Sequence, residues 1–203
     1  MPILYHAPYT RSSTVAALVH ELDTPEIEIR QVTVRRQEGK GAPDPANPHP
    51  EKKVPYLTDG AEEVRERAAI MTYLTDAYPA AGMGPLPGEP GRGAYLSWMA
   101  YYQGVMEPLI LLWYSKLSAP AFSDTMRDME TMYQRLETTL AQGPWLLGDR
   151  FSAADLLCSS PFGWVPGLGD GRPVIQDWVT RCNDRPAMRR VAEEDGQAMA
   201  AIG

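Results

Sequence analysis

Cysteine, histidine and long apolar runs are all scarce in this sequence. It contains two cysteines and three histidines among 203 residues, and no apolar run approaches the roughly 18 residues that a membrane-spanning helix requires. Cys158 and Cys182 lie far apart and neither belongs to a CxxC pair, while the histidines show no metal-ligand spacing. We therefore expect two buried free thiols, no metal site and no membrane as a partner.

Basic residues are also in the minority. The 19 lysines and arginines are outnumbered by 26 aspartates and glutamates, which gives a formal net charge of -7. A protein of that sign gains nothing electrostatically from nucleic acid or from an acidic membrane surface, so neither is an expected partner. The first residues are strand-like and lack the basic and apolar regions of a secretory signal, which predicts a cytoplasmic location.

Proline and glycine are concentrated in one segment, residues 79–93, which holds four prolines and five glycines. Such a segment neither continues a helix nor pairs as a strand, and it is typical of an interdomain linker. A chain of 203 residues is long enough for two small domains. We therefore predict a first domain over residues 1–78 and a second over residues 94–203.

Helix and strand signals alternate before this linker. Strands are predicted at residues 3–6, at 27–34 with a bulge at Arg30–Gln31, and in a hairpin of residues 54–64 that turns at Asp59–Gly60. Helical periodicity begins near Ser12 and returns after the hairpin. The expected first domain is a small mixed sheet with helices packed on it, an α+β arrangement.

Every periodic segment after the linker is helical. One apolar face covers residues 95–109, where Pro108 is expected to kink the helix. Further helices are expected over residues 126–140 and 175–182, and Pro186 suits the first turn of a last helix. The second domain is therefore predicted to be all-α.

Polar side chains mark two helix starts. Thr10 and Ser12, between the first strand and the first helix, are suited either to capping that helix or to donating a hydrogen bond to a bound thiolate. Ser152 and Asp155 form a capping box with an apolar staple around it. The second motif indicates folding rather than catalysis, whereas the first leaves both interpretations open.

Two further motifs suit a peptide-like ligand. The Val54–Pro55 bond is either an ordinary trans bond on an edge strand or a cis bond that presents the Val54 N–H and C=O to such a ligand. Glu66 and Arg67 open a helix, where free N–H groups suit a carboxylate and the Glu66 side chain suits an ammonium group. The alternative is that Glu66 only complements the helix dipole.

In order and spacing, these motifs resemble the bacterial type of the cytosolic glutathione S-transferase family over essentially the whole chain. The similar segments are APYTRSS from Ala7, NPHPEKKVPYLTDG from Asn47, ERAAIMTYL from Glu66, PWLLGDRFSAAD from Pro144 and RPA from Arg185. The resemblance implies a thioredoxin-like domain that binds glutathione as co-substrate, then an all-helical domain, in a chain that acts as a homodimer.

The same resemblance implies roles for residues of the first domain. Val54–Pro55 is expected to be cis, with Val54 paired to the cysteinyl backbone of glutathione. Glu66 and Arg67 are expected to hold the γ-glutamyl end, and Lys53 to lie near the glycyl carboxylate.

The thiol site departs from the family's common pattern. Thr10 stands where serine is common, and no cysteine or catalytic tyrosine is evident there. Arg67 replaces the usual serine, and Lys52 stands where glycine is expected. Thr10 is our first choice as hydrogen-bond donor to the thiolate, and Ser12 is the second.

The resemblance favours an enzyme that conjugates the glutathione thiolate to apolar electrophiles, which would bind between the two domains. Candidate lining residues are Tyr9, Tyr102, Met106, Trp113 and Trp164, although residues at helical spacing are more often part of a core. Two alternatives remain open: glutathione-dependent disulfide reduction or isomerisation at the same site, and a non-catalytic binding or regulatory protein.

Overall fold

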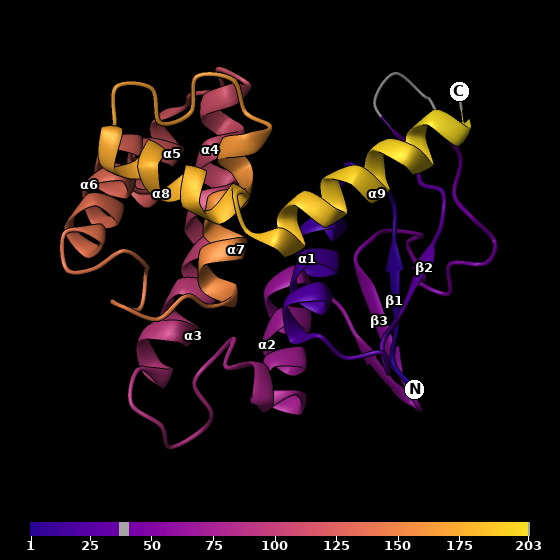
Figure 1. Cartoon of the computed structure of the whole chain (residues 1–203). Helices are drawn as coiled ribbons and strands as arrows, with labels where there is room; N and C mark the ends of the chain where they lie inside the picture. The colour runs from indigo at the N-terminus through magenta and orange to yellow at the C-terminus, as the bar shows by residue number, and fades with distance from the viewer. Residues whose placement is uncertain (37–40, 203) are drawn as a thin grey trace. The chain divides into compact units, whose positions relative to one another are not determined.

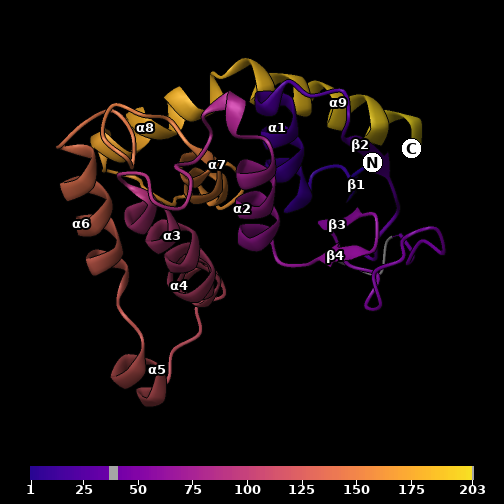
Figure 2. The same cartoon turned by 90° about the horizontal axis from the view of Figure 1, so that it is seen from below.

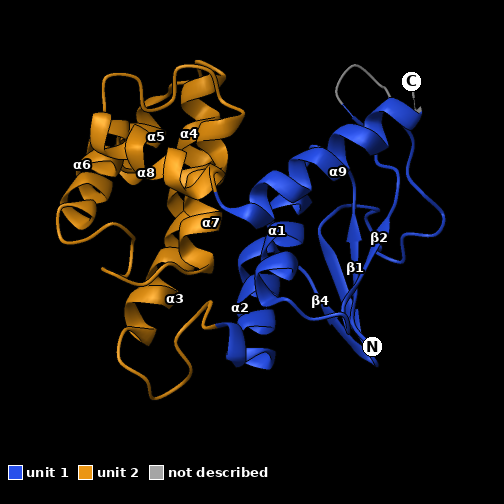
Figure 3. Cartoon of the chain, in the orientation of Figure 1, with its two compact units in different colours: residues 1–81, 185–203 blue, residues 82–184 orange. Residues whose placement is uncertain are grey.

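The computed structural model describes residues 1–36 and 41–202. The chain divides into two compact units, one formed by residues 1–81 with 185–203 and the other by residues 82–184 (Figure 3). The division after residue 81 falls inside the segment that we predicted as a linker. The last helix, within residues 185–203, groups with the first unit, although it falls in the predicted second domain of residues 94–203.

A four-stranded sheet with the order β2-β1-β3-β4 lies in the first unit. Its strands are β1 (Ile3–His6), β2 (Glu28–Gln31), β3 (Tyr56–Asp59) and β4 (Glu62–Val64). β1 pairs in parallel with β2 and antiparallel with β3, and β3 forms the predicted hairpin with β4, in which Gly60 has a φ of 59°. The strand predicted over residues 27–34 is shorter in the structure, because β1 ends at His6 and offers β2 no further partner.

One face of this sheet is covered by helices. The helices of the first unit are α1 (Ser12–Leu22), α2 (Arg67–Ala77), the short 3-10 helix η2 (Pro79–Ala81) and α9 (Pro186–Ile202). Figures 1 and 2 show α1 and α2 side by side against the sheet, with α9 running alongside α1. Because side chains alternate along β1, Leu4 and His6 face these helices, while Tyr5 packs with Val32 and Tyr56 on the other face.

The second unit is helical in the part that the structure describes. Its helices are α3 (Arg92–Tyr101), the π-helix η3 (Tyr102–Met106), α4 (Glu107–Tyr114), α5 (Pro120–Thr125), α6 (Met129–Leu140), α7 (Ala153–Ser159), the 3-10 helix η4 (Ser160–Gly163) and α8 (Pro173–Asn183). The π-helix η3 ends at Met106, just before Pro108, the residue at which a kink is predicted. Proline has no N–H to donate into the preceding turn.

The predicted capping box at the start of α7 is confirmed. Ser152 Oγ accepts the Ala154 N–H at 3.3 Å, and Asp155 Oδ2 accepts the Ser152 N–H at 3.0 Å. The fully buried Asp155 also accepts the N–H of Leu146 at 2.8 Å and the indole N–H of Trp178 at 3.0 Å. Burial raises the pKa of Asp155 to about 6, against the opposing effect of these hydrogen bonds.

Both cysteines fit the sequence prediction. Cys158 on α7 and Cys182 on α8 are both buried.

Candidate functional site

The corner between β1 and α1 gathers hydroxyl groups around one buried atom, Ser12 Oγ. Ser12 is the first residue of α1 and is fully buried. Its Oγ accepts the Ala7 N–H at 3.1 Å and lies 2.7 Å from Thr10 Oγ1 and 2.8 Å from His6 Nδ1. Thr10 is only partly buried, and its Oγ1 also lies 2.8 Å from the Ala7 carbonyl oxygen. Of the two predicted thiolate donors, Thr10 is therefore the one nearer to solvent.

An aspartate from the far end of the chain completes this corner. Asp195 lies on α9, is 1% exposed, and its Oδ1 is 2.9 Å from His6 Nε2. Its Oδ2 accepts the Ser13 hydroxyl at 2.6 Å and the Tyr9 N–H at 2.8 Å. Burial pushes the pKa of Asp195 upward, but the hydrogen bonds from His6, Ser13 and the Tyr9 N–H outweigh it and hold the pKa below its usual value. Asp195 is therefore ionised at neutral pH.

The result is a continuous chain of four polar side chains: Asp195, His6, Ser12 and Thr10. Sequence reasoning found Thr10 and Ser12 but missed the other two. His6 had no signal beyond its place in a strand, and Asp195 lies 189 residues away from it.

The segment that enters β3 has the backbone conformation that the resemblance implied. The Val54–Pro55 bond is cis, as expected. Val54 is half-buried against the cluster that contains Tyr5 and Tyr56. Lys53 is exposed, and its carbonyl oxygen accepts the Asn47 side-chain amide at 3.0 Å.

The start of α2 combines an unusual backbone with an open helix end. Glu66, the N-cap residue, is exposed and has a φ of 66° with a ψ of 128°, a conformation that costs a non-glycine residue on the order of 1–3 kcal/mol. No side-chain cap forms at this end within the described residues, so its N–H groups are suited to an anionic ligand. Arg67, the first residue of the helix, is buried, at 3% exposure.

The predicted electrophile residues fall into different environments. In the first unit, Tyr9 is exposed and its hydroxyl lies toward Gly196 of α9. In the second unit, Tyr102 and Met106 are fully buried on η3, whereas Trp113 and Trp164 are exposed. Trp164 lines a pocket of about 450 Å³ in that unit, whose apolar side chains are those of Phe162, Trp164, Val165, Pro166, Leu168 and Val179.

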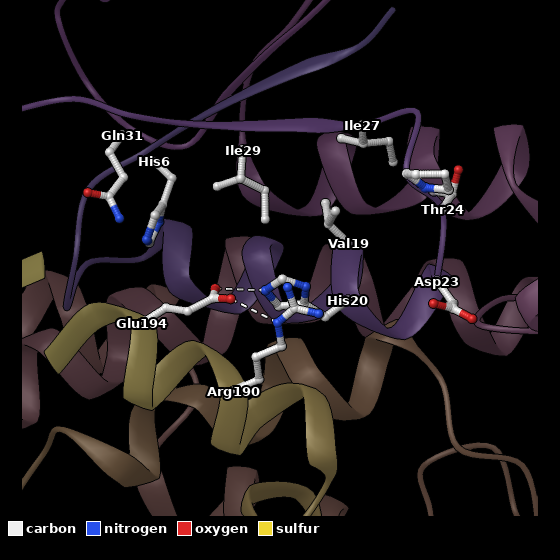
Figure 4. Close-up of a pocket in the computed structure, with 11 residues that line it drawn as sticks. His6, Val19, His20, Asp23, Thr24, Ile27, Ile29, Gln31, Arg190 and Glu194 are labelled. Carbon is white, nitrogen blue, oxygen red and sulfur yellow. Dashed lines mark hydrogen bonds and ion pairs between the residues drawn. The ribbon is translucent and has the colours of Figure 1, made fainter. Parts of the chain in front are cut away.

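A second cavity, of about 720 Å³, lies between β2, α1 and α9 in the first unit (Figure 4). Its apolar wall includes Ile27 and Ile29, and His6 is among its lining residues. Across it, His20 Nε2 and Arg190 Nε lie 2.9 and 2.8 Å from the Glu194 carboxylate. His6 therefore contacts Ser12 with one ring nitrogen and belongs to the wall of a separate cavity.

The described residues contain no group of three or more histidine, cysteine, aspartate or glutamate side chains arranged to hold a metal ion. Among the helices of residues 1–36 and 41–202, none combines the length and apolarity needed to cross a membrane.

Two family models match the chain. The model described as "Glutathione S-transferase, N-terminal domain" matches residues 4–85, and "Glutathione S-transferase, C-terminal domain" matches residues 101–186. Together they span both units.

Several curated proteins are similar to the chain. Glutathione S-transferase aclG of Aspergillus oryzae is 32% identical over 71% of this chain and 74% of that protein. Disulfide-bond oxidoreductase YfcG of Escherichia coli is 26% identical over 91% of each. The match to glutathione S-transferase F14 of Arabidopsis thaliana, at 28% identity, spans 68% of this chain and only 62% of that protein.

Solved structures are also similar to the chain. A glutathione transferase from Methylococcus capsulatus has a TM-score of 0.76 with 28% identity, over 97% of this chain and 100% of that one. A sphingomonad glutathione S-transferase complexed with glutathione has a TM-score of 0.75 with 23% identity, over 96% and 98% of the two chains.

Proposed function

The chain belongs to the glutathione S-transferase family, and on that premise we propose that it conjugates the thiolate of glutathione to apolar electrophiles. The observation that carries the proposal is the partly buried Thr10 hydroxyl at the start of α1, 2.7 Å from the buried Ser12 hydroxyl. A hydroxyl in that position, close to the positive end of a helix, stabilises a bound thiolate.

The remaining glutathione contacts are proposed along two segments. The Val54 backbone pairs with the cysteinyl residue, and the exposed Lys53 side chain neutralises the glycyl carboxylate. At the start of α2, the helix-end N–H groups donate to the γ-glutamyl carboxylate, and the exposed Glu66 side chain pairs with the ammonium group. The buried position of Arg67 favours its backbone over its guanidinium as the contact. Exposed Tyr9 of the first unit, and exposed Trp113 and Trp164 of the second, are the proposed contacts to the electrophile, whereas Tyr102 and Met106 are buried.

Calorimetric titration with glutathione, followed by assays with a panel of electrophiles and low-mass disulfides, tests this function. We expect binding and turnover of at least one apolar electrophile. Glu66→Gln should weaken glutathione binding about 10-fold, because it removes one ion pair worth roughly 1.4 kcal/mol. Glu62→Gln, an exposed glutamate on β4, is the matched control and should bind as the wild type does.

A disulfide reductase is the second candidate function. It is supported by the similarity to YfcG over 91% of the chain. Turnover of disulfides without turnover of any electrophile would favour it. Glutathione binding without either activity would indicate a non-catalytic binding protein, and no binding at all would overturn the proposal.

We also propose a cytoplasmic homodimer. A chain with only two cysteines, both buried, fits a reducing compartment. Apolar side chains are exposed around α4 and α5: Trp113, Tyr114, Leu117 and Phe122. Light scattering at micromolar concentration should give about twice the 22.5 kDa chain mass. Leu117→Asp should lower that mass, whereas Val174→Asp, at an exposed valine of α8, should not. A fully active monomer would contradict the dimer.

A further inference from the structure

We infer, on the basis of the function proposed above, that His6 receives the proton of the glutathione thiol through Ser12 and Thr10, with Asp195 as its carboxylate partner. His6 would then be a positioning residue that acts on the thiol without touching it. The geometry that suggests this is an unbroken series of short contacts: 2.9 Å from Asp195 to His6, 2.8 Å from His6 to Ser12, and 2.7 Å from Ser12 to Thr10.

The direction of the hydrogen bonds follows from the chemistry of the end groups. The Asp195 carboxylate only accepts, so His6 Nε2 carries a proton. In neutral His6, Nδ1 is then an acceptor, and the Ser12 hydroxyl donates to it. The Ser12 proton is then used at His6, so Ser12 Oγ accepts from the Thr10 hydroxyl at 2.7 Å, which shares its proton with the Ala7 carbonyl oxygen at 2.8 Å. In this arrangement the Thr10 hydroxyl points inward and does not face the thiol.

Ionisation of the thiol reverses the two hydrogen bonds that join His6 to Ser12 and Ser12 to Thr10, while His6 Nε2 continues to donate to Asp195. The S–H bond breaks and its proton passes to Thr10 Oγ1, the Thr10 proton passes to Ser12 Oγ, and the Ser12 proton forms an N–H bond at His6 Nδ1. The products are a thiolate and an imidazolium beside the Asp195 carboxylate, so charge and protons balance. The Thr10 hydroxyl now donates outward to the thiolate. The protonated state of His6 is thus what frees the Thr10 proton for the ligand.

The charged surroundings of His6 support this assignment. Asp195 is in contact with it and is held ionised, so it stabilises the imidazolium. The other charged or titratable residues of the cavity wall are His20 on α1, Asp23 just after that helix, and Arg190 and Glu194 on α9. His20 and Arg190 both pair with Glu194 (Figure 4), and the Glu28–Arg30 pair of β2 stands beside Tyr5 on the other face of the sheet.

The cavity that His6 lines is where the transferred proton is expected to reach water. His6 is 3% exposed, so it does not exchange protons freely with bulk solvent. It does line the cavity of about 720 Å³, which is roomy enough for water. A proton received by the His6 ring would pass to water in this cavity.

The test measures the pKa of the bound glutathione thiol from the ultraviolet absorbance of its thiolate. His6→Asn is the informative variant, because an amide retains a hydrogen-bonding group near the Nδ1 position but cannot take up a proton. We expect His6→Asn and Asp195→Asn each to raise the thiol pKa by about one unit or more and to lower kcat/KM about 10-fold near pH 6.5, with the loss fading at higher pH. Binding of S-methylglutathione, which has no thiol proton, should be unchanged.

Glu194→Gln is the matched control, since it changes a carboxylate on the same helix and cavity that does not contact His6. It should leave the thiol pKa at the wild-type value. A thiol pKa that His6→Asn leaves unchanged, or that Glu194→Gln raises equally, overturns the inference. If Asp195→Asn does not fold, His6→Asn decides the question alone. Failure of the proposed function itself would look different: the wild type would then bind neither glutathione nor S-methylglutathione, which overturns both.

Discussion

Asp155→Ala should lower the free energy of unfolding by about 3–5 kcal/mol, because it leaves several buried donors without an acceptor. Each unsatisfied donor costs about 1–3 kcal/mol, and relaxation of the surrounding structure recovers part of the total. The wild-type carboxylate accepts hydrogen bonds from the backbone of Leu146 and Ser152, the Ser152 hydroxyl and the Trp178 indole. These groups come from the preceding turn, from the start of α7 and from α8. Chemical denaturation followed by fluorescence and circular dichroism measures the loss.

Two aspartates in the same unit separate burial from capping. Asp128 caps α6 by accepting the Thr131 N–H at 2.7 Å, but it is exposed, so Asp128→Ala should cost only about 1 kcal/mol. Asp149→Ala, at an exposed residue of the turn before α7, should be nearly neutral. Equal losses in Asp155→Ala and Asp128→Ala would contradict the role of the buried network.

The effect of Asp155→Ala should also depend on pH. The folded-state pKa of about 6 lies above the ordinary 3.8, so protonation of Asp155 favours folding. The stabilisation that comes from protonating Asp155 is complete below its unfolded pKa of 3.8 and is lost as the pH rises through its folded pKa of about 6. The stability difference between wild type and variant should therefore be about 1 kcal/mol larger near pH 5 than near pH 8. A smaller difference near pH 5 would mean that the hydrogen bonds hold the pKa below 3.8.

Thr10→Val should reduce kcat for a chloronitrobenzene electrophile by about 100-fold, the typical cost of removing one donor to a reacting anion. The substitution preserves the shape of the side chain. It removes the Thr10 hydroxyl, which is partly exposed, whereas its neighbour Ser12 is buried. Without that donor the bound thiol ionises less readily, so its pKa should rise while glutathione affinity changes little. Initial-rate kinetics and thiolate absorbance measure the two effects separately.

Three further variants keep this prediction open to contradiction. Thr10→Ser retains the hydroxyl and should retain activity. Thr58→Val makes the same replacement at a partly buried threonine of β3 and should be neutral. Ser12→Ala removes a fully buried hydroxyl that lies 2.7 Å from that of Thr10. If Thr10→Val is neutral and Ser12→Ala abolishes activity, the donor is Ser12.

Local features of this fold could be predicted because their causes are local. The hairpin at Asp59–Gly60 follows from a turn that requires glycine, and α1 begins at Ser12 as its periodicity predicts. The capping box of Ser152 and Asp155 depends on a spacing of three residues. The cis bond at Val54–Pro55 was implied only by the resemblance to a family, because local sequence favours the trans form.

Residue types and their spacing by themselves indicated the hairpin, the start of α1 and the capping box, the change from an α+β part to a helical part, and the hydroxyls at the start of α1. Only the tertiary structure decided which distant groups meet. It placed α9 with the first unit, so that Asp195 lies 2.9 Å from His6, and it placed Trp178 on Asp155. It also buried Tyr102 and exposed Trp113, two aromatic residues with the same apolar signal in sequence. Periodicity specifies which face of an element is apolar, whereas the partner of a polar side chain is fixed by the packing of elements far apart in the chain.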